Sequence, residues 1–401
     1  MLTTERIFWI CLSIIFYSYV GYGIVLLILT GIKQLFIMEV SGIQVQSDVD
    51  RLPEVTLVIA AYNEECIIEE KIKNCFSLNY PNEKLFFLFI TDGSSDKTND
   101  IIGRYPEIKL LHQKERRGKT AALNRAMKYV HTPITVFCDA NAMLNRSAIK
   151  RIVLQYRQAK TGGVSGEKRI IVKGNADAAA VGEGLYWKYE SILKRMDGEL
   201  YTVAGAAGEL FSIRTALWEP LPDETILDDF VISTRVNLKG YRIAYEPNAY
   251  ASEFPSSSIA EERKRKIRIS AGAFQAMPLI AEIFNVFKYP VLFFQFFSHR
   301  FLRWTLTPLC LPMLFIVNIL LFLYAGNSFY TLTFIGQVIF YLTALAGFYF
   351  EPNAYAGRII KICHYFFFMN YSLYLGFIKF LRGRQSVVWD KARRDVMATS
   401  N

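Results

Sequence analysis

Three clusters of polar residues could do chemistry, because each directly follows a run of apolar and β-branched residues. They are Tyr62-Asn63-Glu64, Thr91-Asp92-Gly93-Ser94 and Asp139-Ala140-Asn141. The last lies in the stretch VFCDANAML, where a carboxylate and an amide stand two positions apart. Hard cations such as Mg²⁺ take oxygen ligands of these kinds, but Asp and Asn also favour simple turns. Taken alone, the stretch leaves open whether it is a metal-nucleotide site or a turn.

The runs that precede the clusters are predicted to be strands of one sheet. Four runs are strand-like: 54–62, 84–91, 108–113 and 133–139. The segments between them have helical spacing or helix-capping residues, and such alternation predicts a mostly parallel, Rossmann-like α/β sheet covered on both faces. Ligands of these sheets bind outside the carboxyl ends of the strands. We therefore expect the clusters to converge on one crevice in a soluble block, residues 53–275.

Long apolar segments flank this block and account for a hydrophobic content of 52%. Residues 7–32 contain no charged residue, and about 20 apolar residues suffice to span a bilayer as a helix. A secretory signal would have a shorter apolar core and a cleavage site. We predict a retained transmembrane helix in residues 1–35, a linker in 36–52 and two further transmembrane helices in 305–350.

Two other apolar segments are not clearly transmembrane helices. Residues 276–304 mix aromatic residues with Lys288, His299, Arg300 and Arg303, which predicts interfacial helices whose basic side chains reach lipid headgroups. Residues 351–381 form either an interfacial helix or a further transmembrane helix, and 382–401 form a basic tail. Basic residues beside apolar segments favour the cytoplasmic side. This predicts a multi-pass protein of the cell membrane with its soluble block in the cytoplasm.

The net charge of +10 does not indicate nucleic-acid binding, because the basic residues flank membrane segments or gather in one run. The six cysteines and four histidines show no metal-ligand spacing. This is typical of reduced cysteines in a cytosolic or membrane setting.

Six motifs give a more specific indication: VIAAYNEE, TDGSSD, GKTAALN, FCDAN, ILDDF and RKRKIR, in this order. They resemble those of the family 2 glycosyltransferases, in particular the membrane-embedded branch with the hyaluronan, chitin-oligosaccharide, poly-N-acetylglucosamine and cellulose synthases. The resemblance implies a GT-A fold for residues 53–275. It also implies inverting transfer of a sugar from a UDP-sugar, with Mg²⁺ or Mn²⁺ as cofactor.

The resemblance assigns donor-binding roles to residues of the first three motifs. Ala61, Tyr62 and Glu64 would line the base pocket, and Asp92 would accept the N–H of the uracil edge. The alternative for Asp92 and the residues after it is a turn and helix cap. Lys119 would meet the diphosphate. An anionic ligand there would suit a lysine that lies at the positive end of a helix dipole.

The metal motif of the family is Asp-x-Asp, where this chain has Asp139-Ala140-Asn141. Asp139 would contact the donor and, with Asn141, hold the ion. An amide oxygen still ligates a hard cation, but it contributes no negative charge. We therefore expect a weaker ion site that depends more on the diphosphate.

The catalytic role falls on the acidic pair in ETILDDF. Asp229 would be the general base that takes the proton of the acceptor hydroxyl, and Asp228 would raise its pKa through like-charge proximity. An acid-rich helix N-terminus is the structural alternative. Gly208 and Glu209 lie in the loop that would line the acceptor site, where glycine lets the backbone approach a sugar.

The basic motif resembles the family's Gln-x-x-Arg-Trp. Arg268 would clamp the diphosphate, while Arg265 replaces the glutamine and Ile269 replaces the tryptophan, which puts long-chain processivity in question. The neighbouring basic residues could instead meet anionic lipid. Trp389 and Arg393 of the tail would close over the nucleotide, or belong to a plain basic tail.

These features together predict an inverting, membrane-bound glycosyltransferase that extends a surface or exopolysaccharide. Its partners would be a UDP-sugar, a glycan or lipid-linked acceptor, the lipid bilayer and accessory export proteins. Two alternatives stay open: transfer of a single sugar to a lipid-linked acceptor, and a non-catalytic membrane scaffold that senses nucleotide.

Overall fold

Eight strands form one mixed sheet in the order β3-β2-β1-β4-β7-β6-β8-β5. The computed structural model describes residues 2–38, 52–171, 178–255, 259–348 and 355–383. The strands are β1 (Val55–Ala61), β2 (Leu85–Asp92), β3 (Ile108–Gln113), β4 (Ile134–Asp139), β5 (Met143–Leu144), β6 (Thr161–Ile170), β7 (Leu210–Arg214) and β8 (Arg242–Glu253). The first four pair in parallel, as the sequence predicts, whereas β7 runs antiparallel to β4 and β6.

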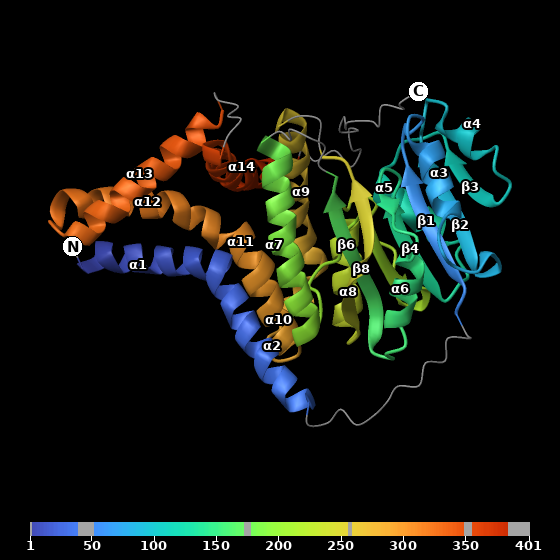
Figure 1. Ribbon diagram of the computed structural model, residues 1–401, viewed down its shortest axis with the longest axis horizontal. Helices are drawn as coiled ribbons and strands as arrows, with labels where there is room; N and C mark the ends of the chain where they lie inside the picture. Colours follow the sequence, from blue (N-terminus) through green and yellow to red (C-terminus); the bar gives the residue numbers. More distant parts are fainter. Residues whose placement is uncertain (1, 39–51, 172–177, 256–258, 349–354, 384–401) are drawn as a thin grey trace.

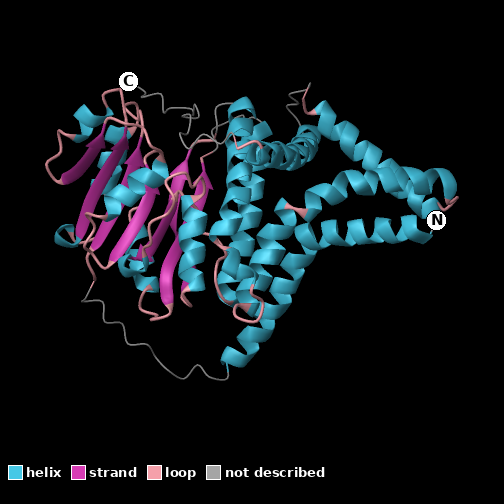
Figure 2. Cartoon of the chain, turned by 180° about the vertical axis from the view of Figure 1, so that it is seen from behind, coloured by secondary structure: helices cyan, strands magenta, loops and turns pink. Residues whose placement is uncertain are grey.

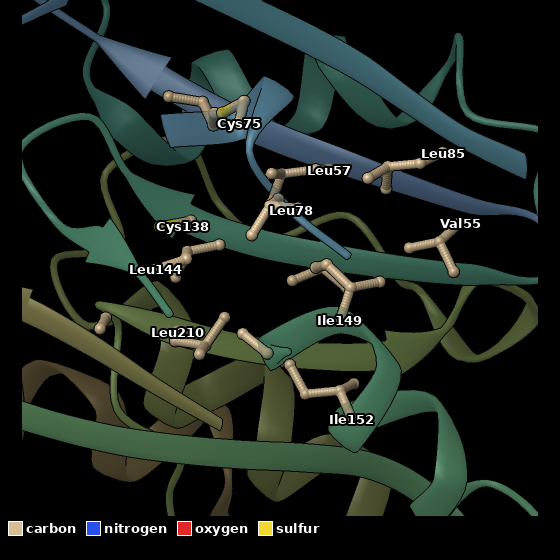
Figure 3. Close-up of a cluster of buried hydrophobic side chains, with 14 of the residues drawn as sticks. Val55, Leu57, Cys75, Leu78, Leu85, Cys138, Leu144, Ile149, Ile152 and Leu210 are labelled. Carbon is tan, nitrogen blue, oxygen red and sulfur yellow. The ribbon is translucent and has the colours of Figure 1, made fainter. Parts of the chain in front are cut away.

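Helices cover both faces of the sheet, because successive residues of its strands point to opposite sides. On one face, Leu57 of β1 packs with Cys75 and Ile149 in the core shown in Figure 3. On the other, Val58 packs with Leu123 and residues of later helices. The helices of the first face are α3 (Ile68–Phe76) and α6 (Ala148–Gln155), those of the second are α5 (Lys119–Met127) and α8 (Asp228–Leu238), and α4 (Thr98–Ile102) precedes β3.

Three long helices lie between the sheet and the apolar helices (Figure 1). They are α7 (Ala178–Leu200), α9 (Ile259–Leu279) and α14 (Tyr355–Leu381). α14 packs very closely on α9 at Gly376, where an added Cβ would lie 2.9 Å from the backbone nitrogen of Ala271. α14 thereby supports the helix that carries Arg265 and Arg268.

Three helices of the described part of the chain are long and apolar enough to cross a membrane: Leu2–Phe36, Leu306–Tyr324 and Ser328–Ala346. The first consists of α1 (Leu2–Phe16), a π-helical turn (Tyr17–Gly21) and α2 (Tyr22–Met38), and the others are α12 (Leu306–Tyr324) and α13 (Ser328–Ala346). α1, α12 and α13 extend away from the sheet (Figure 2). α2 instead packs against α7, where Tyr22 and Leu26 enclose Leu193.

The segment 276–304 differs from its prediction. It contains the end of α9, a 3-10 turn (Ala281–Phe284), α10 (Pro290–Phe296), a π-helical turn (Phe297–Phe301) and α11 (Leu302–Trp304). Lys288 is on the surface, but His299, Arg300 and Arg303 turn inward onto Glu190 of α7. The expectation that these three side chains reach headgroups is therefore wrong, because a buried carboxylate offers them a partner.

Candidate active site

A cavity of about 880 Å³ opens at the carboxyl ends of β1 and β4 and continues between α7, α9 and α14. It brings together most of the predicted site residues. Those that line it are Tyr62, Glu64, Lys119, Asp139, Asn141, Gly208, Glu209, Asp228, Asp229, Arg265 and Arg268. The polar clusters after β1 and β4 thus converge on one crevice, as their positions at strand ends predict.

Lys119, the first residue of α5, lies at the centre of the crevice. Its Nζ is 2.8 Å from Asp139 Oδ1 and 3.5 Å from Asp228 Oδ2. Burial lowers the pKa of Lys119, but Asp139 and Asp228 outweigh that effect and raise it above its usual value. Lys119 is therefore a permanent cation between two carboxylates. One of them, Asp139, is the last residue of β4.

Asp92 is held at the start of α5. It is only 1% exposed, and its carboxylate accepts the backbone N–H groups of Arg117 (3.0 Å) and Gly118 (2.7 Å). Each of its oxygens thus helps to fix the start of α5, where Gly118 has a φ of 99°. Asp92 therefore acts as a positioning residue for Lys119. Its bond to a uracil edge stays a prediction, because each carboxylate oxygen can accept a further hydrogen bond.

The prediction for Ala61, the last residue of β1, is off by one position. Ala61 packs its side chain into the core, whereas its neighbour Ala60 lines the cavity. The alternation of side chains along a strand explains the shift by one residue. Tyr62 lines the cavity as predicted, and the guanidinium of Arg116 stacks 3.6 Å from its ring centre. Arg116 carries no motif, so the sequence did not reveal this contact.

The acidic pair occupies the first turn of α8. Asp228 is almost fully buried, while Asp229 faces Gly208 so closely that a Cβ on Gly208 would lie 3.0 Å from Asp229 Oδ2. Burial, followed by the charge of Asp228, raises the pKa of Asp229 to about 7, although Lys119 opposes both. A carboxylate with this pKa is well suited to accept a proton near neutral pH.

Glu209 belongs to an ion cluster beside the acidic pair. Lys168 of β6, fully buried, contacts both Glu209 (2.6 Å) and Glu253 of β8. Against the effect of burial, Lys168 holds the pKa of Glu209 below its ordinary value. Arg265 also faces these carboxylates, at 3.6 Å from Glu209. Sequence reasoning did not find Lys168 or Glu253, because they lie on strands far from any motif.

Arg268 differs from Arg265 in having donors to spare. Within the described ranges it makes no hydrogen bond or ion pair, although it lines the cavity. Burial lowers the pKa of Arg268, and the charge of Asp228 opposes this most strongly. Its guanidinium is therefore available to an anionic ligand. Trp389 and Arg393 lie outside the residues that the structure describes.

The mostly parallel sheet with a crevice of acidic and basic side chains at its carboxyl edge agrees with the GT-A fold that the motifs predict. Residues 56–217 match the model of the glycosyl transferase family 2. This match covers part of the chain and agrees with the resemblance seen in its motifs, and both indicate a glycosyltransferase domain.

Two relatives have the same description, poly-β-1,6-N-acetyl-D-glucosamine synthase. That of Staphylococcus aureus (strain MSSA476) is 28% identical over 258 residues, covering 60% of this chain and 59% of the relative's length. That of Staphylococcus epidermidis is 25% identical over 345 residues, covering 79% and 80%. Together with the three apolar helices, these relatives indicate a membrane protein.

A solved structure shares both parts of the fold. The mannosyltransferase PcManGT from Pyrobaculum calidifontis, in complex with GDP-Man and Mn²⁺, superposes with a TM-score of 0.69 at 19% identity. The match covers 95% of this chain and 99% of that one. The sheet and the long helices beside it therefore belong to one established architecture.

Proposed function

We propose that the protein is an inverting glycosyltransferase that transfers a sugar from a UDP-sugar to a growing surface glycan. The observation that carries the proposal is the juxtaposition of Asp229 with Gly208 in the cavity that also contains Lys119, Asp139 and Arg268. A proton acceptor and two cations around one crevice are what displacement of a nucleoside diphosphate requires. The charge bias of the flanking segments supports a multi-pass topology with this crevice on the cytoplasmic side.

The donor diphosphate would lie against Lys119 and Arg268. Both are cations at the crevice, and Arg268 has unused donors. As the bond between sugar and diphosphate breaks, negative charge grows on the leaving group, and fixed cations stabilise it. On the other side of the sugar, Asp229 would take the proton of the acceptor hydroxyl while the new glycosidic bond forms with inversion.

A divalent ion would add to this charge neutralisation, since Mg²⁺ or Mn²⁺ supplies Lewis acidity to a phosphoryl oxygen. Asp139 and Asn141 both line the cavity and would hold it. Searched over the described residues, the chain has no group of three acidic, His or Cys side chains that could bind a metal alone. One carboxylate and one amide nevertheless fit an ion that takes its other ligands from the diphosphate and water.

Changing Asn141 to Asp is expected to strengthen metal binding in the presence of UDP by about tenfold, because a second carboxylate adds charge to the site. Calorimetric titration of Mn²⁺ into the protein with UDP measures this, and UDP-dependent thermal stabilisation is a second readout. Asn327→Asp is the control, since Asn327 caps α13 far from the site and Asp preserves such a cap. Equal Mn²⁺ affinity in both variants would contradict a metal role for residue 141.

Transfer to a lipid-linked acceptor is the second candidate function. It is favoured by Ile269, which stands where processive relatives have tryptophan, and by the extension of the cavity to α14. The full-length protein should be given UDP-sugars, with GDP-mannose as a competing donor class. A ladder of product lengths supports the glycan synthase, and a single addition supports the second candidate. Transfer from GDP-mannose alone would overturn the UDP-sugar assignment.

A further inference from the structure

The cavity has a second arm that the proposed chemistry does not use. Beyond Asp229 it runs between α7, the π-helical turn Phe297–Phe301 and α14. Its charged lining includes Lys194 and Arg300, and its apolar lining includes Phe366 and Met369. Figure 1 shows α7 and α14 at this place, between the sheet and the candidate membrane spans.

Lys194 is the most unusual residue of this arm. It is only 4% exposed, yet it lines the cavity and, among the described residues, makes no hydrogen bond or ion pair. Its Nζ faces the ring of Trp187, 5.4 Å from the ring centre. Burial, followed by the charge of Arg300, lowers the pKa of Lys194. The charge of Glu190 opposes this only through space. An enclosed ammonium without a direct ion pair is costly, which points to an anion that completes the site.

Arg300 adds a second cation with unused donors. Its Nη1 is 3.5 Å from Glu190 Oε2, but its buried Nε has no partner in the described part of the chain. Glu190 is shared, because His299 lies 3.2 Å and Arg303 2.6 Å from it.

Arg300 and Arg303 share the one carboxylate of Glu190, and Lys194 makes no direct ion pair among the described residues. The arm is therefore suited to an anion that contacts these cations.

The opposite wall of the arm is apolar. α14 contributes Ile362, Phe366, Met369 and Leu373. The N-terminal helix meets this wall at Tyr19, whose hydroxyl donates to Asn370 at 3.0 Å and whose ring lies 4.9 Å from that of Phe366. The first candidate span therefore forms part of the arm. A ligand that fills it must be anionic on one side and apolar on the other.

We propose that this arm binds the phosphate group and adjoining hydrocarbon chain of a lipid acceptor. Lys194 and Arg300 would contact the phosphate oxygens, and the apolar wall of α14 would receive the chain. This inference rests on the second candidate function, transfer to a lipid-linked acceptor, because it names that acceptor for the same cavity. Its chemistry is that of a lipid phosphate, in which charge and chain are both required for binding.

The test uses the full-length protein in detergent without donor and three probes: farnesyl phosphate, farnesol and inorganic phosphate. Farnesyl phosphate is expected to raise the melting temperature and to bind at least tenfold tighter than either fragment. Lys194→Gln should weaken its binding about tenfold or more, because it removes the charge from a hydrogen bond to the phosphate. Arg300→Gln should act in the same direction. Lys288→Gln, at an exposed lysine paired with Glu282, is the matched control and should leave binding unchanged.

The outcomes distinguish a lipid phosphate from a purely apolar ligand and from a free anion. Equal binding of farnesol and farnesyl phosphate would show a merely apolar groove and overturn the proposal. If inorganic phosphate binds as tightly as farnesyl phosphate, the cations bind free anions and the chain adds nothing. That result would also overturn the proposal. UDP binding by Lys194→Gln reports whether the variant is folded. Because no donor is present, failure of sugar transfer would not affect this result, and failure of lipid binding would leave the transfer assays valid.

Discussion

Replacing Asp229 with Asn is expected to lower the rate of sugar transfer by about 10²- to 10⁴-fold, the usual contribution of a general base. Asn has nearly the shape of Asp but cannot accept the proton of the acceptor hydroxyl. Lys119 forms its ion pairs with Asp139 and Asp228 rather than with Asp229, so UDP should bind with nearly unchanged affinity. Release of UDP from the donor, measured with acceptor present, gives the rate, and calorimetry gives the affinity.

The control for this variant is Asp100→Asn, which makes the same change at an exposed position in α4. It should transfer sugar at the wild-type rate. If Asp229→Asn retained more than a tenth of that rate, the proton would have to leave through another group, and the assignment of the base would be wrong. Asp228→Asn would not substitute for this test, because Asp228 also pairs with Lys119.

The raised pKa of Asp229 also predicts the pH dependence of transfer. Since the base acts when deprotonated and its pKa is about 7, kcat/KM should fall about tenfold per pH unit below 7 and level off above it. The folded state disfavours the ionised carboxylate of Asp229, so the contribution of this residue to stability declines as the pH rises from about 4 toward 7. Asp229→Asn removes this penalty, and its gain in melting temperature should therefore be larger at pH 8 than at pH 5. A gain independent of pH would contradict the raised pKa.

The sequence predicted the strands and the strand-end clusters because both signals are local. A continuous run of apolar and β-branched residues along β1, and turn residues at its end, need no knowledge of the rest of the fold. The errors began where tertiary context decides. Ala60 and Ala61 are chemically alike, and only the packing of the sheet determines which one faces the cavity. The sequence also does not show that the carboxylate of Asp92 accepts two backbone N–H groups at the start of α5, which is 25 residues further along the chain.

The second arm of the cavity could not be predicted for a related reason. Glu190 lies in a helix without a motif, and its partner Arg303 is 113 residues away in a segment that resembles an interfacial helix. Amphipathic spacing shows that a helix has a buried face but not which charge meets it there. Sequence reasoning therefore placed the cations of 276–304 at the membrane surface, where isolated basic residues usually lie.

Replacing Glu190 with Ala is expected to have the largest effect on stability, about 3–5 kcal/mol, the usual loss when one partner of a buried ion pair is removed. Glu190 is fully buried and contacts His299, Arg300 and Arg303. Its loss would leave the two arginines without their carboxylate partner. Thermal unfolding of the detergent-solubilised protein, followed by intrinsic fluorescence, measures the loss. Glu199→Ala is the matched control on the same helix.

The contrast between the two glutamates isolates burial as the cause. Glu199 also pairs with an arginine, at 2.9 Å, but its side chain and that of Arg195 are exposed, so the pair should contribute only about 0–1 kcal/mol. The cluster around Glu190 also joins three parts of the chain, since Arg303 donates to the backbone of Ser18 at 3.0 Å. Loss of Glu190 should therefore also expose the junction of α2 and α7 to proteolysis. Equal melting temperatures for the two variants would show that this cluster does not hold the N-terminal helix to the glycosyltransferase domain.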